Sequence, residues 1–468
     1  MISRYIVALM IAACIASTTH AAEEKVSGAE HPHDVPLAST TNVAEEKTPD
    51  WNATTLTGDW GGTRTSLYNK GINWAFTHKS DFLANTSGGL KRGANWMGYT
   101  EAGVKMDLEK LWGWDSTTAY VHYHSELGTQ FNQKYVGSFV GVDNIETAAN
   151  TAQFNSIWIQ KSMFGDNLSV LAGLYAIDSE FYVTDTTGLF IQPPYGMSND
   201  VAQTINNSSN APAIYPVGAL AVRVKYTSPS KSFYAQYALA DGVPGDPNNP
   251  RGTHVQLNKG DGTLSIVELG YTPQEGSEPP FPTEHPGDPV PPETKIHEES
   301  ETFNKTAIGF WNYTARFDDL IDVNALGIRP SYGAYFLAER TLFVEKDHPS
   351  QGLSGFVRFG TASKDVHQAD WTGSLGLRYH GLCDGRDDDI AGIAVTYNHA
   401  SDKFRQLVAG TASNQTQVEA TYRAQIKPWF ALQPTLQFIS NPNMKIDANG
   451  NPTLQNVWII GTRAEIAF

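Results

Sequence analysis

Hydrophobic and polar residues alternate with a period of two along most of this chain. The last fourteen residues, 455–468, show the pattern well: Trp458 and Ile460 fall on one face, and Arg463 and Glu465 fall on the other. Successive side chains of a β-strand point to opposite faces, so the segment predicts a strand with one apolar and one polar face. An outer-membrane barrel needs such strands, about ten residues long, apolar toward lipid and polar toward the lumen. An edge strand of a soluble β-sandwich is the alternative for this segment.

Sixteen segments carry a strand pattern, and bacterial single-chain barrels have an even number of strands. We therefore predict an all-β fold, a transmembrane antiparallel β-barrel over residues 72–468 with a short N-terminal periplasmic helix. The predicted strands are 72–84, 96–109, 117–127, 153–163, 168–177, 216–228, 231–241, 263–272, 303–316, 329–341, 353–361, 371–381, 390–400, 415–427, 429–440 and 455–468.

The links between these strands alternate between short and long, as periplasmic turns and extracellular loops do in such barrels. The long links are 128–152, 178–215 and 242–262, and the first two are expected to fold into the lumen. Residues 273–302 break the alternation on the periplasmic side. They are rich in proline and hold eight acids against one lysine, so we interpret them as a disordered insertion. A strand count that is wrong by one before this segment is the alternative.

The N-terminal region divides into three parts. Residues 1–22 have the features of a secretory signal peptide, with Arg4 before an apolar stretch and small residues at its end. Cys14 also lies in a sequence that resembles a lipoprotein cleavage site. Residues 23–55 predict a disordered periplasmic tail, in which His31 and His33 could bind a metal only weakly. Residues 56–71 predict a periplasmic motif and a short helix.

The composition favours one large sheet and excludes several functions. Charged residues make up 18% of the chain, glycine occurs 41 times, and after the N-terminus no apolar run is long enough to predict a spanning helix. The net charge of −16 is concentrated in 23–50 and 273–302. Basic residues form no stripe, so we expect no nucleic-acid partner. Phosphate-loop and GxSxG motifs are missing from the sequence, so we expect no cofactor and no catalytic site.

Charged residues at lumen-facing positions are the candidates for contact with a solute. Arginine presents five donors in a rigid fork, which suits adjacent hydroxyl groups, but pairing of these charges with each other on the wall is the alternative. In the loop 178–215, Tyr195 is a candidate for stacking on a sugar ring. The lumen-facing candidates are Glu101, Lys105, Arg223, Arg358, Arg378, Glu419, Arg423, Arg463 and Glu465.

Two other classes of site can be considered. His122 and His124 share a face with Glu126, but this spacing on one strand lacks a clear third ligand, so no metal site is expected. An enzyme in a barrel would need a positioned nucleophile and base, and with no GxSxG motif in the sequence we do not expect one. A receptor with a plug domain would need about 22 strands, for which the chain is too short.

Several short motifs resemble the carbohydrate-selective porin family, the OprB-type porins. They are the opening motif LTGDWGGTR at 56–64, then Phe310-Trp311-Asn312-Tyr313, Gly333-Ala334-Tyr335, Gly385-Arg386, and Leu432-Gln433-Pro434 with Asn441-Pro442.

The resemblance spans residues 56 to 468, and the insertion and the acidic tail depart from it. It implies a sixteen-stranded channel in the outer membrane of a Gram-negative bacterium. Loops fold inward to narrow this channel, and charged residues line the narrow part. The expected function is passive diffusion of small neutral carbohydrates, monosaccharides or polyols; a general diffusion porin is the alternative. Outer-membrane lipid would surround the barrel, and a homo-oligomer is possible.

Overall fold

The computed structural model describes residues 48–128, 130–202, 208–273, 303–445 and 449–468. The expected signal peptide, the acidic tail up to residue 47 and nearly all of the 273–302 insertion lie outside these residues. Within the described ranges, no helix is long and apolar enough to cross a membrane.

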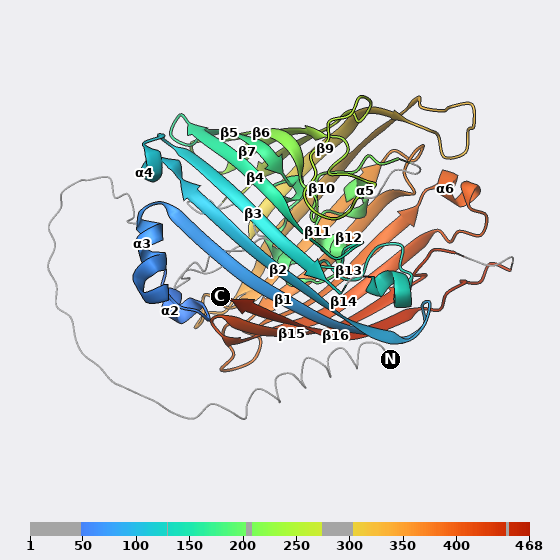
Figure 1. Cartoon of the computed structure of the whole chain (residues 1–468). Helices are drawn as coiled ribbons and strands as arrows, with labels where there is room; N and C mark the ends of the chain where they lie inside the picture. The colour runs from blue at the N-terminus through green and yellow to red at the C-terminus, as the bar shows by residue number, and fades with distance from the viewer. Residues whose placement is uncertain (1–47, 129, 203–207, 274–302, 446–448) are drawn as a thin grey trace.

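The sixteen predicted strands are all present, and they form one closed barrel (Figure 1). Each strand pairs antiparallel with its neighbours in sequence, and β16 returns to pair with β1. The prediction of the fold is confirmed, and the antiparallel pairing of β8 with β9 excludes a miscounted strand before the insertion. The strands are β1 Ile72–Ser87, β2 Gly93–Asp107, β3 Thr117–Leu127, β4 Thr151–Met163, β5 Leu168–Tyr175, β6 Ala219–Thr227, β7 Phe233–Asp241, β8 Thr263–Tyr271, β9 Asn304–Phe317, β10 Arg329–Val344, β11 Gly352–Ala362, β12 Ala369–His380, β13 Ile390–Ala400, β14 Asn414–Lys427, β15 Phe430–Ser440 and β16 Val457–Ala467.

The period-two pattern separates the two faces of the wall. In β6, Leu220, Val222 and Val224 point outward and are 38–48% exposed, while Arg223 between them is 2% exposed. The outward residues form the lipid-facing surface, and the inward residues contact material inside the barrel. Closure of the sheet pairs the backbone groups of both terminal strands, so the wall has no open edge to expose to lipid.

Apart from the link between β8 and β9, short turns lie at one end of the barrel and the longest loops at the other, and the helices α2 and α3 lie at the short-turn end (Figure 1). The turn between β6 and β7 spans residues 228–232, whereas the loop between β5 and β6 spans 176–218. The short-turn end is periplasmic by the rule that governs such barrels. The helices are α2 Trp51–Thr54, η1 Trp60–Gly62, α3 Thr63–Asn69, α4 Leu108–Trp112, η2 Asn132–Val136, η3 Ile177–Ser179, η4 Asp185–Leu189, η5 Pro193–Tyr195, α5 Asn199–Ala202 and α6 Asp402–Leu407.

The segment before the barrel is more ordered than the sequence predicted. The disordered tail was expected to extend to residue 55, but α2 forms within it because Trp51 finds a buried place. The Arg64 guanidinium lies 4.7 Å from the Trp51 ring centroid and 4.5 Å from that of Trp60. The short helix expected in 56–71 is α3, and Gly71 follows it with a φ of +94°. Two aromatic rings around one cation thus hold this segment together.

Candidate functional site: the constricted lumen

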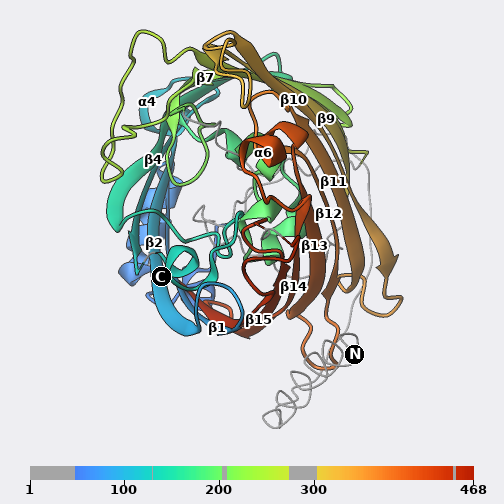
Figure 2. The same cartoon turned by 90° about the vertical axis from the view of Figure 1, so that its right-hand side faces the viewer.

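Two long loops cross the lumen and meet the opposite wall, as their lengths predicted (Figure 2). In the loop between β3 and β4 (residues 128–150), Phe139 donates its backbone N–H to Gln415 Oε1 of β14 at 3.0 Å. In the loop between β5 and β6 (residues 176–218), backbone groups reach β10, β11, β14 and β15. The two loops also touch each other, because Asn144 donates to the carbonyl of Ile191 at 2.8 Å. Together they narrow the barrel.

Arg358 of β11 holds the β5–β6 loop by its carbonyl groups. Its Nη1 donates to Pro194 and Tyr195 at 3.3 and 2.6 Å. Its Nη2 donates to Tyr182 and Gly196 at 3.1 and 2.5 Å. The side chain is 1% exposed. The guanidinium therefore binds the loop and does not face the solute path. The planar fork of arginine is suited to gathering several acceptors in this way.

Buried carboxylates of the wall hold the amide groups of the same loop. Glu419 of β14 accepts from the backbone N–H of Ile191 and of Gln192 at 2.8 and 2.9 Å. Glu339 of β10 accepts from both the N–H and the hydroxyl of Thr186 at 2.9 Å. Hydrogen bonds to a charged acceptor are shorter and stronger than neutral ones. The wall thus supplies acceptors to the loop amides and donors to the loop carbonyls.

Glycine and aromatic residues make room for this loop. The Asp200 carboxylate lies so close to β11 that a Cβ on Gly360 would sit 2.0 Å from its Oδ2. The ring of Tyr182 stacks on Tyr335 of β10 with centroids 4.0 Å apart. Tyr195, predicted to stack on a sugar, is 2% exposed and packs against neighbouring aromatic rings. Because its side chain is buried among these rings, it cannot stack on a solute in this structure. It anchors the loop instead.

Two other predicted arginines also bind protein groups and do not face open solvent. Arg463 of β16 pairs with Asp81 of β1 at 2.6 Å and donates to Asn144 Oδ1 of the β3–β4 loop at 2.6 Å. Arg223 of β6 forms a two-pronged pair with Glu180 of the β5–β6 loop at 2.7 and 2.9 Å. Both arginines are nearly buried. They tie the loops to the wall.

Glu101 belongs to a buried group on β1, β2 and β3. It accepts from the Thr77 hydroxyl at 2.6 Å and lies 3.3 Å from His122 Nε2. His124 Nδ1 lies 2.5 Å from Glu126, which also accepts from the Tyr215 hydroxyl of the β5–β6 loop. Within the described ranges, no three or more His, Cys, Asp or Glu side chains are grouped so that they could hold a metal ion, at these histidines or elsewhere.

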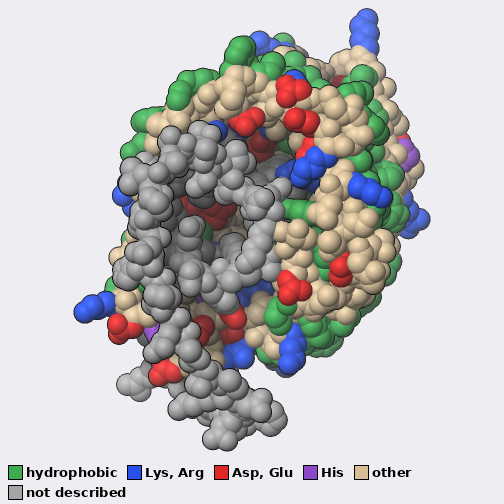
Figure 3. All heavy atoms as spheres, turned by 90° about the vertical axis from the view of Figure 1, so that its left-hand side faces the viewer, with side chains coloured by type: hydrophobic (Ala, Val, Ile, Leu, Met, Phe, Trp, Pro, Cys, Tyr) green, Lys and Arg blue, Asp and Glu red, His purple; other side chains and the backbone are tan. Residues whose placement is uncertain are grey.

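The remaining predicted charges keep part of their surface accessible. Arg423 and Glu465 pair at 2.8 Å, and their side chains are 26% and 24% exposed. Lys79 stands directly opposite Glu465 in the β1–β16 register and is 13% exposed. Lys105 is half-buried, and so is Arg378, which lies over the ring of Phe303 at 4.9 Å. These residues lie toward the periplasmic half of the wall. Figure 3 shows side chains of both charges around the hollow at that end.

Sequence reasoning missed Glu339 and Glu268, which accept hydrogen bonds from the loop as the predicted Glu419 does. Glu268 of β8 accepts from the Tyr182 N–H at 2.8 Å and from the Tyr335 hydroxyl at 2.7 Å. Both acids fall at lumen-facing positions of their strands, so the same alternation could have found them.

Comparison with known proteins agrees with this architecture. The family model for the carbohydrate-selective porins, OprB family, matches residues 91–468. The chain belongs to this family. The porin is 24% identical to Porin B of Pseudomonas aeruginosa, with 92% of this chain and 95% of that protein covered. It is 21% identical to the putative porin QuiX of Acinetobacter baylyi, with coverages of 88% and 93%.

Solved structures confirm the fold. The high-pH structure of Pseudomonas putida OprB superimposes with a TM-score of 0.74 at 20% identity, covering 89% of this chain and 99% of that chain. The low-pH structure of the same protein gives a TM-score of 0.53 at 18% identity, with the same coverages. The protein is thus a carbohydrate-selective porin, a multi-pass protein of the Gram-negative outer membrane, as the resemblance of its motifs implied.

The inward loop of the porin carries acids in an unusual state. Burial raises the pKa of Asp178 to about 7. The hydrogen bond that its carboxylate accepts from the Tyr215 N–H at 3.0 Å opposes this shift. Burial likewise raises the pKa of Asp200 to about 7, although hydrogen bonds and Arg358 oppose it. Burial disfavours the charged carboxylate. In the docked loop these acids therefore hold protons that they would release in water.

We predict that docking of the β5–β6 loop weakens as pH rises. Between the ordinary pKa of aspartate, about 4, and about 7, the docked loop binds more protons than the released loop. Stability that depends on these protons is present at low pH and is lost as pH rises through that window. Hydrogen exchange of residues 178–200, corrected for its intrinsic pH dependence, should show stronger protection at pH 5 than at pH 8. Asp200→Asn should reduce the difference, while Asp166→Asn in the β4–β5 turn should retain it. A difference that persists unchanged in Asp200→Asn would contradict this assignment.

Glu419→Ala should loosen the loop and widen the channel. The substitution leaves two buried amide donors without their carboxylate acceptor, and leaving a buried polar group unsatisfied costs roughly 1–3 kcal/mol. We expect larger single-channel conductance and larger current fluctuations in planar bilayers. Glu101→Ala is the matched control, because it removes an equally buried carboxylate whose hydrogen bond and ion pairs lie on the wall. Equal conductance changes in the two variants would contradict the role of Glu419 as a loop anchor.

Proposed function

We propose that this porin passes small neutral carbohydrates, monosaccharides or polyols, through an aperture bounded by the two inward loops and the β14–β16–β1 wall. The observation that carries the proposal is that the lumen charges fall into two sets, one buried against the loops and one partly accessible. Arg358, Glu419, Arg463 and Arg223 are nearly buried and engage the loops, whereas Arg423 and Glu465 keep about a quarter of their side chains accessible.

Lys79, Arg423 and Glu465 offer donors and an acceptor side by side. A sugar presents hydroxyl groups that both donate and accept, so it can bind such a mixed set without carrying a net charge. Hydrogen bonds with ionised partners are stronger than neutral ones, which favours polyhydroxyl solutes over apolar ones of the same size. We propose Lys105 and Arg378 as further contacts on the way to the periplasm, with Glu101 stabilising the wall.

We also propose that the chain acts only as a channel and has no catalytic activity. The polar groups of the lumen are engaged in loop and wall contacts, and diffusion through a constriction needs no energy input. A general diffusion porin that selects by size or charge alone is the second candidate. The width that the loops leave is a feature that both functions share, so solute discrimination must distinguish them.

Liposome swelling with the purified porin tests the proposal. Glucose should enter faster than amino acids of similar size, and disaccharides should enter more slowly than monosaccharides. Arg423→Gln and Glu465→Gln should each weaken sugar binding, measured as sugar-induced current block, by about threefold to tenfold, as expected for the loss of one hydrogen bond worth ~0.5–1.5 kcal/mol.

Arg386→Gln is the control for this experiment. Arg386 forms an equivalent pair with Asp389 at 2.8 Å, but in the turn between β12 and β13. The control should leave sugar block unchanged. Discrimination by size alone, with identical block in all variants, would refute sugar selectivity and support the general porin.

A further inference from the structure

The barrel wall is uneven in height. Strands β5 to β8 have 8 or 9 residues each, whereas β1, β2, β9 and β10 have 14 to 16. A spanning strand needs about 9 to 11 residues. The strands β5 to β8 are therefore at the lower limit of the length that crosses a bilayer. Ile157 of β4 pairs with Leu174 near the end of β5, so residues 151–156 of β4 continue past β5 on the extracellular side. The wall is notched there.

The β7–β8 loop (residues 242–262) lies in this notch. Gly252 donates its N–H to Thr151 Oγ1 at 2.7 Å, and Phe154 donates its N–H to Thr253 Oγ1 at 2.6 Å. These bonds join the loop to the extracellular end of β4. Figure 2 shows the loop reaching beyond the ring of strands beside β4 and β7. The loop therefore extends the outer wall where the strands are short.

Two apolar side chains of this loop are exposed, among polar ones such as Asn249, Gln256 and Asn258. Val255 is 51% exposed and Leu257 is 69% exposed. Leu257 lies beside the lipid-facing side chains of Leu220, Val222 and Leu239, which are 38–48% exposed. Leu257 thus adds to the apolar surface that the barrel presents to the membrane.

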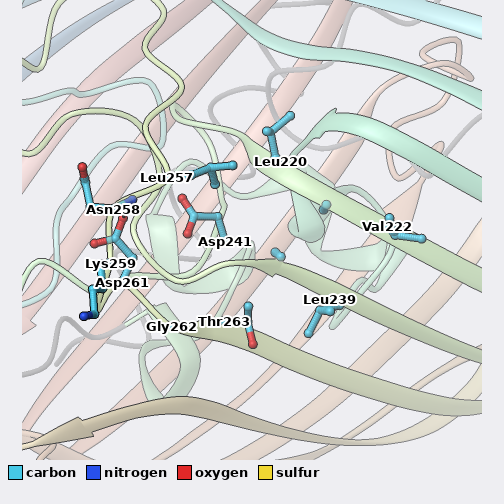
Figure 4. Close-up of a pocket in the computed structure, with 12 residues that line it drawn as sticks. Leu220, Val222, Leu239, Asp241, Leu257, Asn258, Lys259, Asp261, Gly262 and Thr263 are labelled. Atoms are coloured by element: carbon cyan, nitrogen blue, oxygen red, sulfur yellow. Dashed lines mark hydrogen bonds between the residues drawn. The ribbon is translucent and has the colours of Figure 1, made fainter.

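A groove separates the loop from the strands (Figure 4). Leu220, Val222 and Leu239 form its strand side, and Leu257, Asn258 and Lys259 contribute from the loop. Lys259 is exposed and forms no hydrogen bond or ion pair within the part of the chain described here. The groove is thus apolar along the wall, and its polar side carries the cation Lys259 together with the acids Asp241 and Asp261.

We propose that this groove binds an acyl chain of lipopolysaccharide, with a phosphate of its lipid A headgroup beside Lys259. The groove lies at the long-loop end, in the leaflet where lipopolysaccharide resides, and opens onto the lipid-facing wall. An acyl chain in this groove packs its methylenes against leucine and valine side chains, and such dispersion contacts add up along the chain. Ammonium and phosphate are complementary charges. Lipopolysaccharide thereby stabilises the loop that completes the notched wall.

Two acids also line the groove and affect the expected conditions. Asp261 accepts the N–H of Asn258 at 2.8 Å, so this carboxylate is turned toward the loop backbone. Asp241 ends β7 at the same place. A divalent cation can bridge a carboxylate and a phosphate, so we expect binding to strengthen with Mg²⁺.

Native mass spectrometry of the full-length porin in detergent tests the proposal, with purified bisphosphorylated lipid A titrated in the presence of Mg²⁺. A one-to-one complex is expected. Val222→Trp fills the groove and Lys259→Glu reverses its charge, so each should weaken binding at least tenfold. Val357→Trp on the lipid-facing side of β11 and Lys346→Glu in the periplasmic β10–β11 turn are the matched controls and should bind normally.

Other outcomes would overturn the proposal. Equal binding by the groove variants and their controls would show that the contact is not at this groove. Equal affinity for phosphatidylglycerol would refute the assignment to lipid A. A dimer that Val222→Trp disrupts would assign the groove to a second copy of the chain. Heat-dependent mobility on gels verifies that each variant is folded, and unchanged glucose swelling would separate this site from the proposed sugar path.

Discussion

The fold of the constriction depends on one requirement: backbone groups that leave water must find partners. A loop that crosses the inside of a barrel has no neighbouring strand to satisfy it. Here ionisable side chains of the wall provide the partners, since Arg358 reaches four carbonyl groups and Glu419 reaches two amides. The position of the loop, and with it the width of the channel, therefore follows from a few buried side chains on strands far from it in sequence.

The closed sheet makes this arrangement possible. Because every strand is paired on both sides, the wall is rigid enough to hold its charges at fixed positions. Alternation then gives each strand one row of side chains for the membrane and one for the lumen. Gly360 shows how tightly the two parts fit, since any side chain at that position would collide with Asp200 of the loop. The position of the loop and the width that it leaves open thus rest on the same contacts.

The sequence predicted the wall far better than the site. A period of two is a local property, so all sixteen strands and the inward direction of Arg358 or Glu419 could be inferred without knowledge of the fold. The role of these charges could not, because their partners lie more than a hundred residues away in a loop without periodicity. Tyr195 was assigned to the solute for the same reason: its burial depends on Phe190 and Phe356, which only the folded loop brings together.

The most direct test of this account is the single-channel conductance of Arg358→Lys in planar bilayers, with Arg386→Lys as the control. Lysine keeps the charge but lacks the fork that joins four carbonyl groups. We predict that Arg358→Lys conducts more ions and loses glucose block, although its side chain is buried away from the solute path, while Arg386→Lys in the β12–β13 turn keeps the conductance of the unmodified porin. An unchanged conductance in a correctly folded Arg358→Lys would contradict the claim that buried wall charges set the width of the channel through the loop.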